Sequence, residues 1–152
     1  MVTQLYTKQP RCAPRWYHDF MQSVPLGHVI DIAAQVLDLS RADVRRVMNI
    51  PLAESALNAP YAGFGEYERY PTLAERAAVL CSRLARNHCL PDGNKRLAYL
   101  SMIEYIERNG GTFDDSDQDD IADTIEQLAA SELSELMFTG WVVRRIRTTA
   151  IR

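Results

Sequence analysis

Six residues of the kinds that bind phosphate and move protons lie within nine positions near the middle of the chain. They are His88, Asp92, Gly93, Asn94, Lys95 and Arg96. An apolar stretch follows at once, so the loop leads into the first turn of a helix, where outward N–H groups and the helix dipole favour an anion. Lys95 and Arg96 add full positive charges that suit phosphate oxygens. The pattern predicts a phosphate-binding site.

Two residues of this loop indicate what happens to the phosphate. A carboxylate such as Asp92 repels phosphate unless a divalent cation bridges the two, which predicts Mg²⁺ at Asp92. The imidazole of His88 could accept a proton from an attacking hydroxyl. Each residue alone also fits a structural role, such as a helix cap or a solvated charge. The joint pattern favours nucleotide-dependent transfer onto an alcohol.

Helices predicted from apolar spacing and capping residues would hold this loop. They run from His28 through Leu39, from Ser40 through Met48, from Thr72 to about Asn87, over Leu97 to Ile106, around Ile121 to Leu128, and from Ser131 through Trp141. Thr72 and Glu75 form a capping box, which makes that start signal strong. The helix after the loop is apolar around most of its circumference and should lie at the centre of the fold.

The remaining segments complete an all-α prediction. Asn58 to Pro71 is rich in Gly, Pro and aromatic residues and should form a loop or a small hairpin. Residues 1–25 contain three prolines and no clean period, so we expect an irregular lead-in before a single helical domain at 26–152.

Composition limits the partners. A hydrophobic fraction of 47% and the lack of a long apolar run exclude a membrane span and a secretory signal, so the expected location is cytoplasmic. Cys12, Cys81 and Cys89 fit neither a disulfide framework nor a metal-ligand spacing. Asp31 to Asn49 faintly resembles the helix-turn-helix of LacI-like regulators. However, its turn is one residue too long, and a net charge of −3 makes nucleic acid an unlikely partner, so two core helices are the better interpretation.

The stretch HCLPDGNKR, from His88 to Arg96, resembles the loop of the Fic/Doc superfamily, usually written HxFx(D/E)GN(G/K)R. With a lysine at position 95 it is similar to the Doc (death-on-curing) branch. The resemblance extends over about Pro51 to Asp115. It implies a Fic/Doc-like helical domain with a central buried helix and a short β-hairpin flap.

This resemblance implies a role for each residue of the loop. His88 would be the general base on a Ser or Thr hydroxyl of a target protein, and Asp92 would hold Mg²⁺. Gly93 and Asn94 would form an anion hole, to which Asn94 would also add its side chain. Arg96 would clamp a phosphate.

Lys95 and the flap would set the outcome of the reaction. Lys95 replaces the second glycine of the Fic loop, which implies transfer of the γ-phosphate of ATP, with a translation elongation factor as one target class. The flap residues Ala62, Gly63, Phe64 and Gly65 would align the target by strand pairing. The resemblance also implies a separate small antitoxin. No inhibitory (S/T)xxxE(G/N) helix stands where the family carries one, which argues against self-inhibition.

Departures from the family pattern leave alternatives open. Cys89-Leu90 replaces the usual Pro-Phe, and Leu97 replaces a frequent Thr. Leu90 can still anchor the loop, and Cys89 is better read as a small buried hydrophobe than as a nucleophile or redox sensor. The alternatives to a Doc-type kinase are a Fic-type adenylyltransferase and an inactive homologue that still binds nucleotide.

Overall fold

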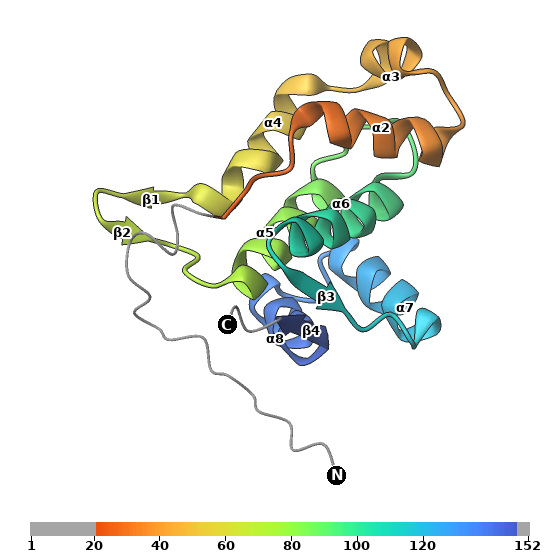
Figure 1. Cartoon of the computed structure of the whole chain (residues 1–152). Helices are drawn as coiled ribbons and strands as arrows, with labels where there is room; N and C mark the ends of the chain where they lie inside the picture. The colour runs from red at the N-terminus through yellow and green to blue at the C-terminus, as the bar shows by residue number, and fades with distance from the viewer. Residues whose placement is uncertain (1–20, 149–152) are drawn as a thin grey trace.

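The computed structural model describes residues 21–148, and the chain is mainly helical over that range (Figure 1). Its helices are α2 (Leu26–Leu37), α3 (Arg41–Val47), α4 (Ile50–Asn58), α5 (Leu73–Arg86), α6 (Asn94–Arg108), α7 (Gln118–Ala129) and α8 (Glu135–Arg145), with a 3₁₀ turn η1 (Ala59–Tyr61). The strands are β1 (Gly63–Phe64), β2 (Tyr67–Glu68), β3 (Gly111–Phe113) and β4 (Ile146–Thr148). The predicted helical fold with a short hairpin is confirmed.

Both strand pairs within residues 21–148 are antiparallel and short. In the β1–β2 hairpin Gly63 pairs with Glu68 and Phe64 with Tyr67. β3 pairs with β4, which lies far along the chain, and this second pair was not predicted from the sequence. No helix in the described part of the chain has the length and apolar character to cross a membrane.

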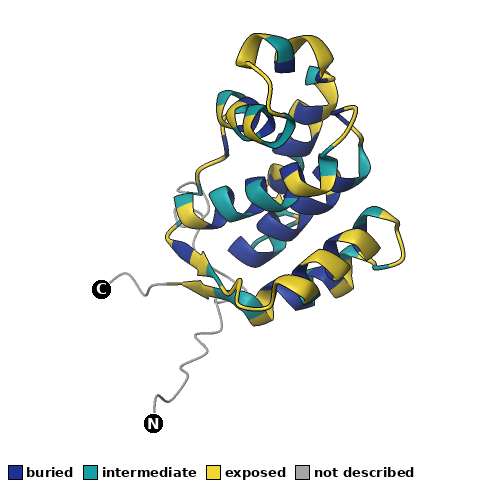
Figure 2. Cartoon of the chain, turned by 90° about the vertical axis from the view of Figure 1, so that its right-hand side faces the viewer, coloured by how far each residue is buried: buried dark blue, intermediate teal, exposed yellow. Residues whose placement is uncertain are grey.

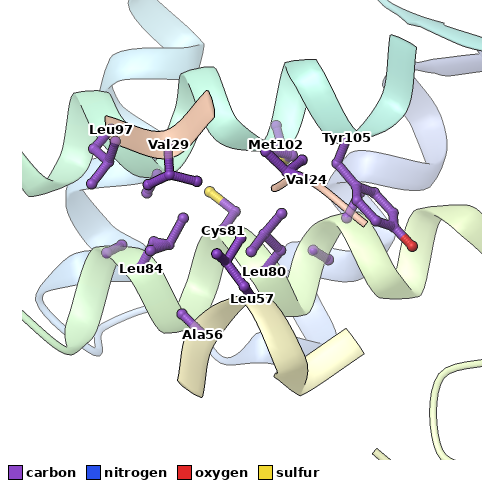
Figure 3. Packing of buried hydrophobic residues seen from close by; sticks show 14 of the residues in the cluster. Val24, Val29, Ala56, Leu57, Leu80, Cys81, Leu84, Leu97, Met102 and Tyr105 are labelled. Atoms are coloured by element: carbon purple, nitrogen blue, oxygen red, sulfur yellow. The ribbon is translucent and has the colours of Figure 1, made fainter. Parts of the chain in front are cut away.

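Helices α5 and α6 form the centre of the fold. The predicted capping box begins α5, because the Thr72 hydroxyl accepts from the Glu75 N–H at 3.2 Å and the Glu75 carboxylate accepts from the Thr72 N–H at 2.9 Å. Leu80, Cys81 and Leu84 of α5 lie between α4 on one side and α6 on the other (Figure 3). Buried residues gather where the helices face one another, and the outer faces are exposed (Figure 2). This packing stabilises the two helices whose junction carries the loop.

Helices α2 and α3 belong to this core. Val29 and Ile30 of α2 and Val44 of α3 are fully buried. The core-helix interpretation of Asp31 to Asn49 therefore agrees with the structure. Of the predicted lead-in, residues 1–20 lie outside the described residues. Residues 21–25 are irregular, as expected, yet Val24 is buried in the core.

One helix was not predicted, and the start of another differs from the prediction. Helix α4 was not predicted; it begins after Asn49, whose side chain caps the Leu52 N–H. The last helix begins after Ser134, three residues later than expected. Ser131 instead ends α7 with a left-handed φ of 59°, and the Ser131 and Glu132 N–H groups bond back to carbonyls of the helix.

Candidate functional site

The predicted loop joins the end of α5 to the start of α6, with Gly93 as the N-cap of α6. Glycine suits this position for two independent reasons. Its φ is +77°, a left-handed value that other residues adopt only at a cost. A Cβ atom at Gly93 would also lie 2.6 Å from the Val36 Cγ1 of α2. The start of α6 is therefore set by close backbone approach to α2.

The side chain of Asn94 closes the loop on itself. Its Oδ1 accepts from the Leu90 N–H at 3.0 Å, and its Nδ2 donates to the Leu90 carbonyl at 2.8 Å. Both polar atoms of this side chain therefore bond the loop backbone, and its part in an anion hole stays a prediction. Those part-buried backbone groups need partners away from water. Asn94 can also offer an anion its backbone N–H, which lies in the first turn of α6.

Two further bonds fasten the loop to α4. The Asn49 N–H donates to the Cys89 carbonyl at 2.7 Å, and the Asn87 side chain donates to the Leu52 carbonyl at 2.8 Å. Cys89 and Leu90 are buried, so Leu90 anchors the loop as expected. The loop is consequently held on both sides before any ligand binds.

The environment of Cys89 opposes a nucleophilic role. Burial raises the pKa of its thiol to about 11, so the thiol is neutral near pH 7. Its sulfur lies 3.9 Å from the Asn94 Oδ1. These observations favour the interpretation of Cys89 as a small buried side chain.

His88 is exposed beside this buried pair of residues and has a left-handed φ of 52°. Its imidazole forms no hydrogen bond with any residue between 21 and 148. A positive φ in a non-glycine residue costs about 1–2 kcal/mol and persists where the surroundings impose it. The anchored loop supplies that constraint and keeps the imidazole at the surface.

Asp92 is exposed, and one of its carboxylate oxygens accepts from the Gly93 N–H at 2.7 Å. The Gly93 N–H predicted for the anion hole is therefore engaged. No group of three or more His, Cys, Asp or Glu side chains that could hold a metal occurs among the described residues. A lone carboxylate still fits Mg²⁺, which commonly binds through one or two carboxylates together with substrate phosphates. Asp92 would hold a magnesium ion that arrives with a nucleotide.

Lys95 and Arg96 line a groove of about 370 Å³ between the N-terminal part of α6 and one side of α7. The other lining residues are Tyr99, Gln118, Ile121, Ala122, Ile125 and Glu126. Arg96 has no hydrogen bond or ion pair with any residue of the described range, whereas the Lys95 Nζ lies 3.6 Å from the Glu126 Oε1. The two predicted cations therefore share one groove.

The other groove residues were not predicted from the sequence as part of the site. Tyr99 carried a detectable signal, because it follows Lys95 and Arg96 by four and three positions and must share their helix face. The residues of α7 carried none, since their proximity depends on how α7 packs.

The predicted flap lies at the other end of α5 from the loop (Figure 1). Phe64 at its tip is 90% exposed. Arg76 holds its base, through Glu68 at 3.4 Å and the Tyr70 carbonyl at 2.8 Å. A 14-residue helix is about 21 Å long, so the structure does not bring Ala62–Gly65 next to His88.

Together these features define a helical domain in which two central helices are joined by a constrained loop with exposed charged side chains. The model of the Fic/DOC family matches residues 23–106, a range that runs from before α2 into α6 and contains the whole loop. Because this match covers more than half of the chain, the protein belongs to the Fic/DOC family.

A curated relative adds a second comparison. Toxin Doc of Mycolicibacterium smegmatis is 38% identical over 65 residues, which are 43% of this chain and 50% of that protein. The chain thus aligns with about half the length of this relative.

Proposed function

We propose that this protein is a Doc-like toxin that transfers the γ-phosphoryl group of ATP to a Ser or Thr hydroxyl of a target protein. The observation that carries the proposal is that some residues of the loop fix its backbone while others present polar side chains to solvent. Asn94, Cys89 and Leu90 fix the backbone from inside, which leaves His88 and Asp92 exposed. Such preorganisation lowers the cost of aligning reacting groups.

Phosphate binding falls to the start of α6. The N–H groups of Asn94 and Lys95 belong to the first helical turn, where intrahelical acceptors are lacking. No acidic residue lies in that turn to oppose an anion. The Arg96 guanidinium, unpaired within residues 21–148, would clamp a phosphate in the groove.

The transfer step then needs one proton acceptor. His88 would take the proton of the acceptor hydroxyl while the hydroxyl oxygen bonds to the γ-phosphorus. The bond from that phosphorus to the β,γ-bridging oxygen breaks, and ADP leaves. Mg²⁺ bound at Asp92 would supply charge neutralisation on the phosphates.

The target would reach His88 along α5. If an extended segment pairs with the β1–β2 hairpin, about six or seven residues at roughly 3.3 Å each must separate that pairing from the acceptor hydroxyl, given the length of α5. The name of the relative, Toxin Doc, supports the assignment as a toxin. A cytoplasmic location and a small antitoxin partner belong to the same proposal. The proposed target class is a translation elongation factor.

The test uses purified protein, Mg²⁺ and a bacterial lysate with ATP labelled at the α- or the γ-phosphate. His88→Ala is the test variant, and His28→Ala is its matched control because it also removes an exposed imidazole. Label from γ-ATP alone that is lost only in His88→Ala supports the proposal. Label from α-ATP indicates adenylyl transfer and overturns the role given to Lys95. ATP binding without label from either position favours the inactive homologue.

A further inference from the structure

The groove that contains Lys95 and Arg96 also contains the carboxylate of Glu126, whose negative charge would repel phosphate. Glu126 of α7 faces Lys95 of α6 with 3.6 Å between Oε1 and Nζ, and both residues line the groove. The side chains are 70% and 55% exposed, so neither is held by the core. Arg96, which lines the same groove, has no such counter-ion within the described range.

This ion pair contributes little to the fold. Exposed pairs are worth roughly 0.2–1 kcal/mol, and the Glu126 side chain forms no other hydrogen bond or ion pair with any residue in 21–148. The carboxylate is consequently free to affect ligand binding without being needed for folding. Its negative charge opposes any anion that approaches Lys95.

We propose that Glu126 tunes the affinity of the groove for phosphate groups, as the resident counter-ion of Lys95 that a ligand phosphate must displace. This inference rests on the proposed function and adds a residue of α7 to the site. Glu126 lowers the affinity of the groove for phosphate groups, and it acts through Lys95. Binding therefore exchanges one anionic partner of Lys95 for another.

The test measures Kd by calorimetry on the full chain with two probes, inorganic tripolyphosphate and MgATP. The variants are Glu126→Gln, Asp123→Asn, Lys95→Gln and the double variant Lys95→Gln/Glu126→Gln. Asp123→Asn is the matched control, because it removes one negative charge from the exposed surface of α7 without lining the groove. Circular dichroism verifies that each variant is folded.

We expect Glu126→Gln to bind both probes about two- to fivefold more tightly at low ionic strength, with a smaller gain in high salt. Asp123→Asn should change Kd by less than about 1.5-fold. In the Lys95→Gln background the Glu126 effect should disappear.

Three results would overturn the inference: equal gains in Glu126→Gln and Asp123→Asn, an undiminished gain without Lys95, or no tripolyphosphate binding by any variant. The two proposals fail separately. If tripolyphosphate shows the expected pattern while MgATP binds to no variant, the nucleotide function is wrong and the role of Glu126 toward phosphate groups stands.

Discussion

Gly93 and Val36 are in close contact, and the space between the Gly93 Cα and a Val36 methyl group has no room for a side-chain carbon. An added Cβ would lie 2.6 Å from Cγ1. This approach fixes the first turn of α6 against α2, and it joins the loop from His88 to Arg96 to a helix that contains none of the motif.

Gly93→Ala should therefore destabilise the protein by about 2–4 kcal/mol, from the left-handed backbone and the steric overlap together. Val36→Ala alone should cost about 1 kcal/mol, because this side chain is only half-buried. In the double variant the overlap is relieved, so the loss should be smaller than the sum by about 1 kcal/mol or more. Urea unfolding of the four proteins measures this coupling. Strict additivity would show that the two residues are not in steric contact.

Asn94→Ala should cost about 2 kcal/mol, because the N–H and the carbonyl of Leu90 both lose their partner. Hydrogen exchange at the Leu90 amide should accelerate along with this loss. Asn94→Asp keeps the acceptor and loses the donor, so the Leu90 amide should stay more protected than in Asn94→Ala. Unchanged exchange in Asn94→Ala would contradict the side-chain closure of the loop.

Cys89 should resist alkylation in the folded protein. Raising the thiol pKa from 9.0 to about 11 lowers the thiolate population near pH 7.5 by on the order of 100-fold, because only the thiolate reacts. Iodoacetamide labelling read by peptide mass spectrometry, with and without guanidinium, measures the difference. The control is that Cys89 labels readily once unfolded. Rapid labelling of the native chain would instead restore the nucleophile hypothesis.

Stability should fall in acid partly through Asp120. The pKa of this carboxylate is lowered by the hydrogen bond from the Trp141 indole at 2.8 Å and by the Arg145 guanidinium. A depressed pKa contributes stability above the ordinary aspartate value of about 3.9 and loses it as the pH falls through the folded value.

Asp120→Asn should therefore lower the urea midpoint at pH 7 and flatten its decline below about pH 4. Asp123→Asn, on the same helix, serves as the control and should leave the shape of the curve unchanged. An acid limb of equal steepness in Asp120→Asn and the parent would remove Asp120 from this account.

Local chemistry made much of the fold predictable. The Thr72–Glu75 capping box lies at the start of α5, as expected, because both of its bonds form within four residues. The position of Gly93 at the start of α6 likewise followed from the polar loop and the apolar run after it. Composition indicated a loop or small hairpin at Asn58 to Pro71, and the family resemblance added its interpretation as a target-docking flap.

Other features depended on distant parts of the chain. Ser131 and Ser134 are equivalent candidates for a helix cap, and the choice was decided by how α7 ends. The β3–β4 pair joins Gly111 to Thr148, a contact that no local pattern encodes. Glu126 entered the site only through the packing of α7 on α6, and the bonds from the Asn94 side chain to the Leu90 backbone depend on how the loop closes.

At His88 the left-handed backbone makes the residue that is best for stability different from the residue that the proposed activity needs. Glycine adopts a φ of 52° without strain, so His88→Gly should gain about 1 kcal/mol from the backbone while it removes the proposed base. Random mutation under selection for fold alone would drift toward small residues there. A histidine retained at this position across natural variants of the chain would thus be evidence of selection for chemistry, since folding gives no reason to keep it.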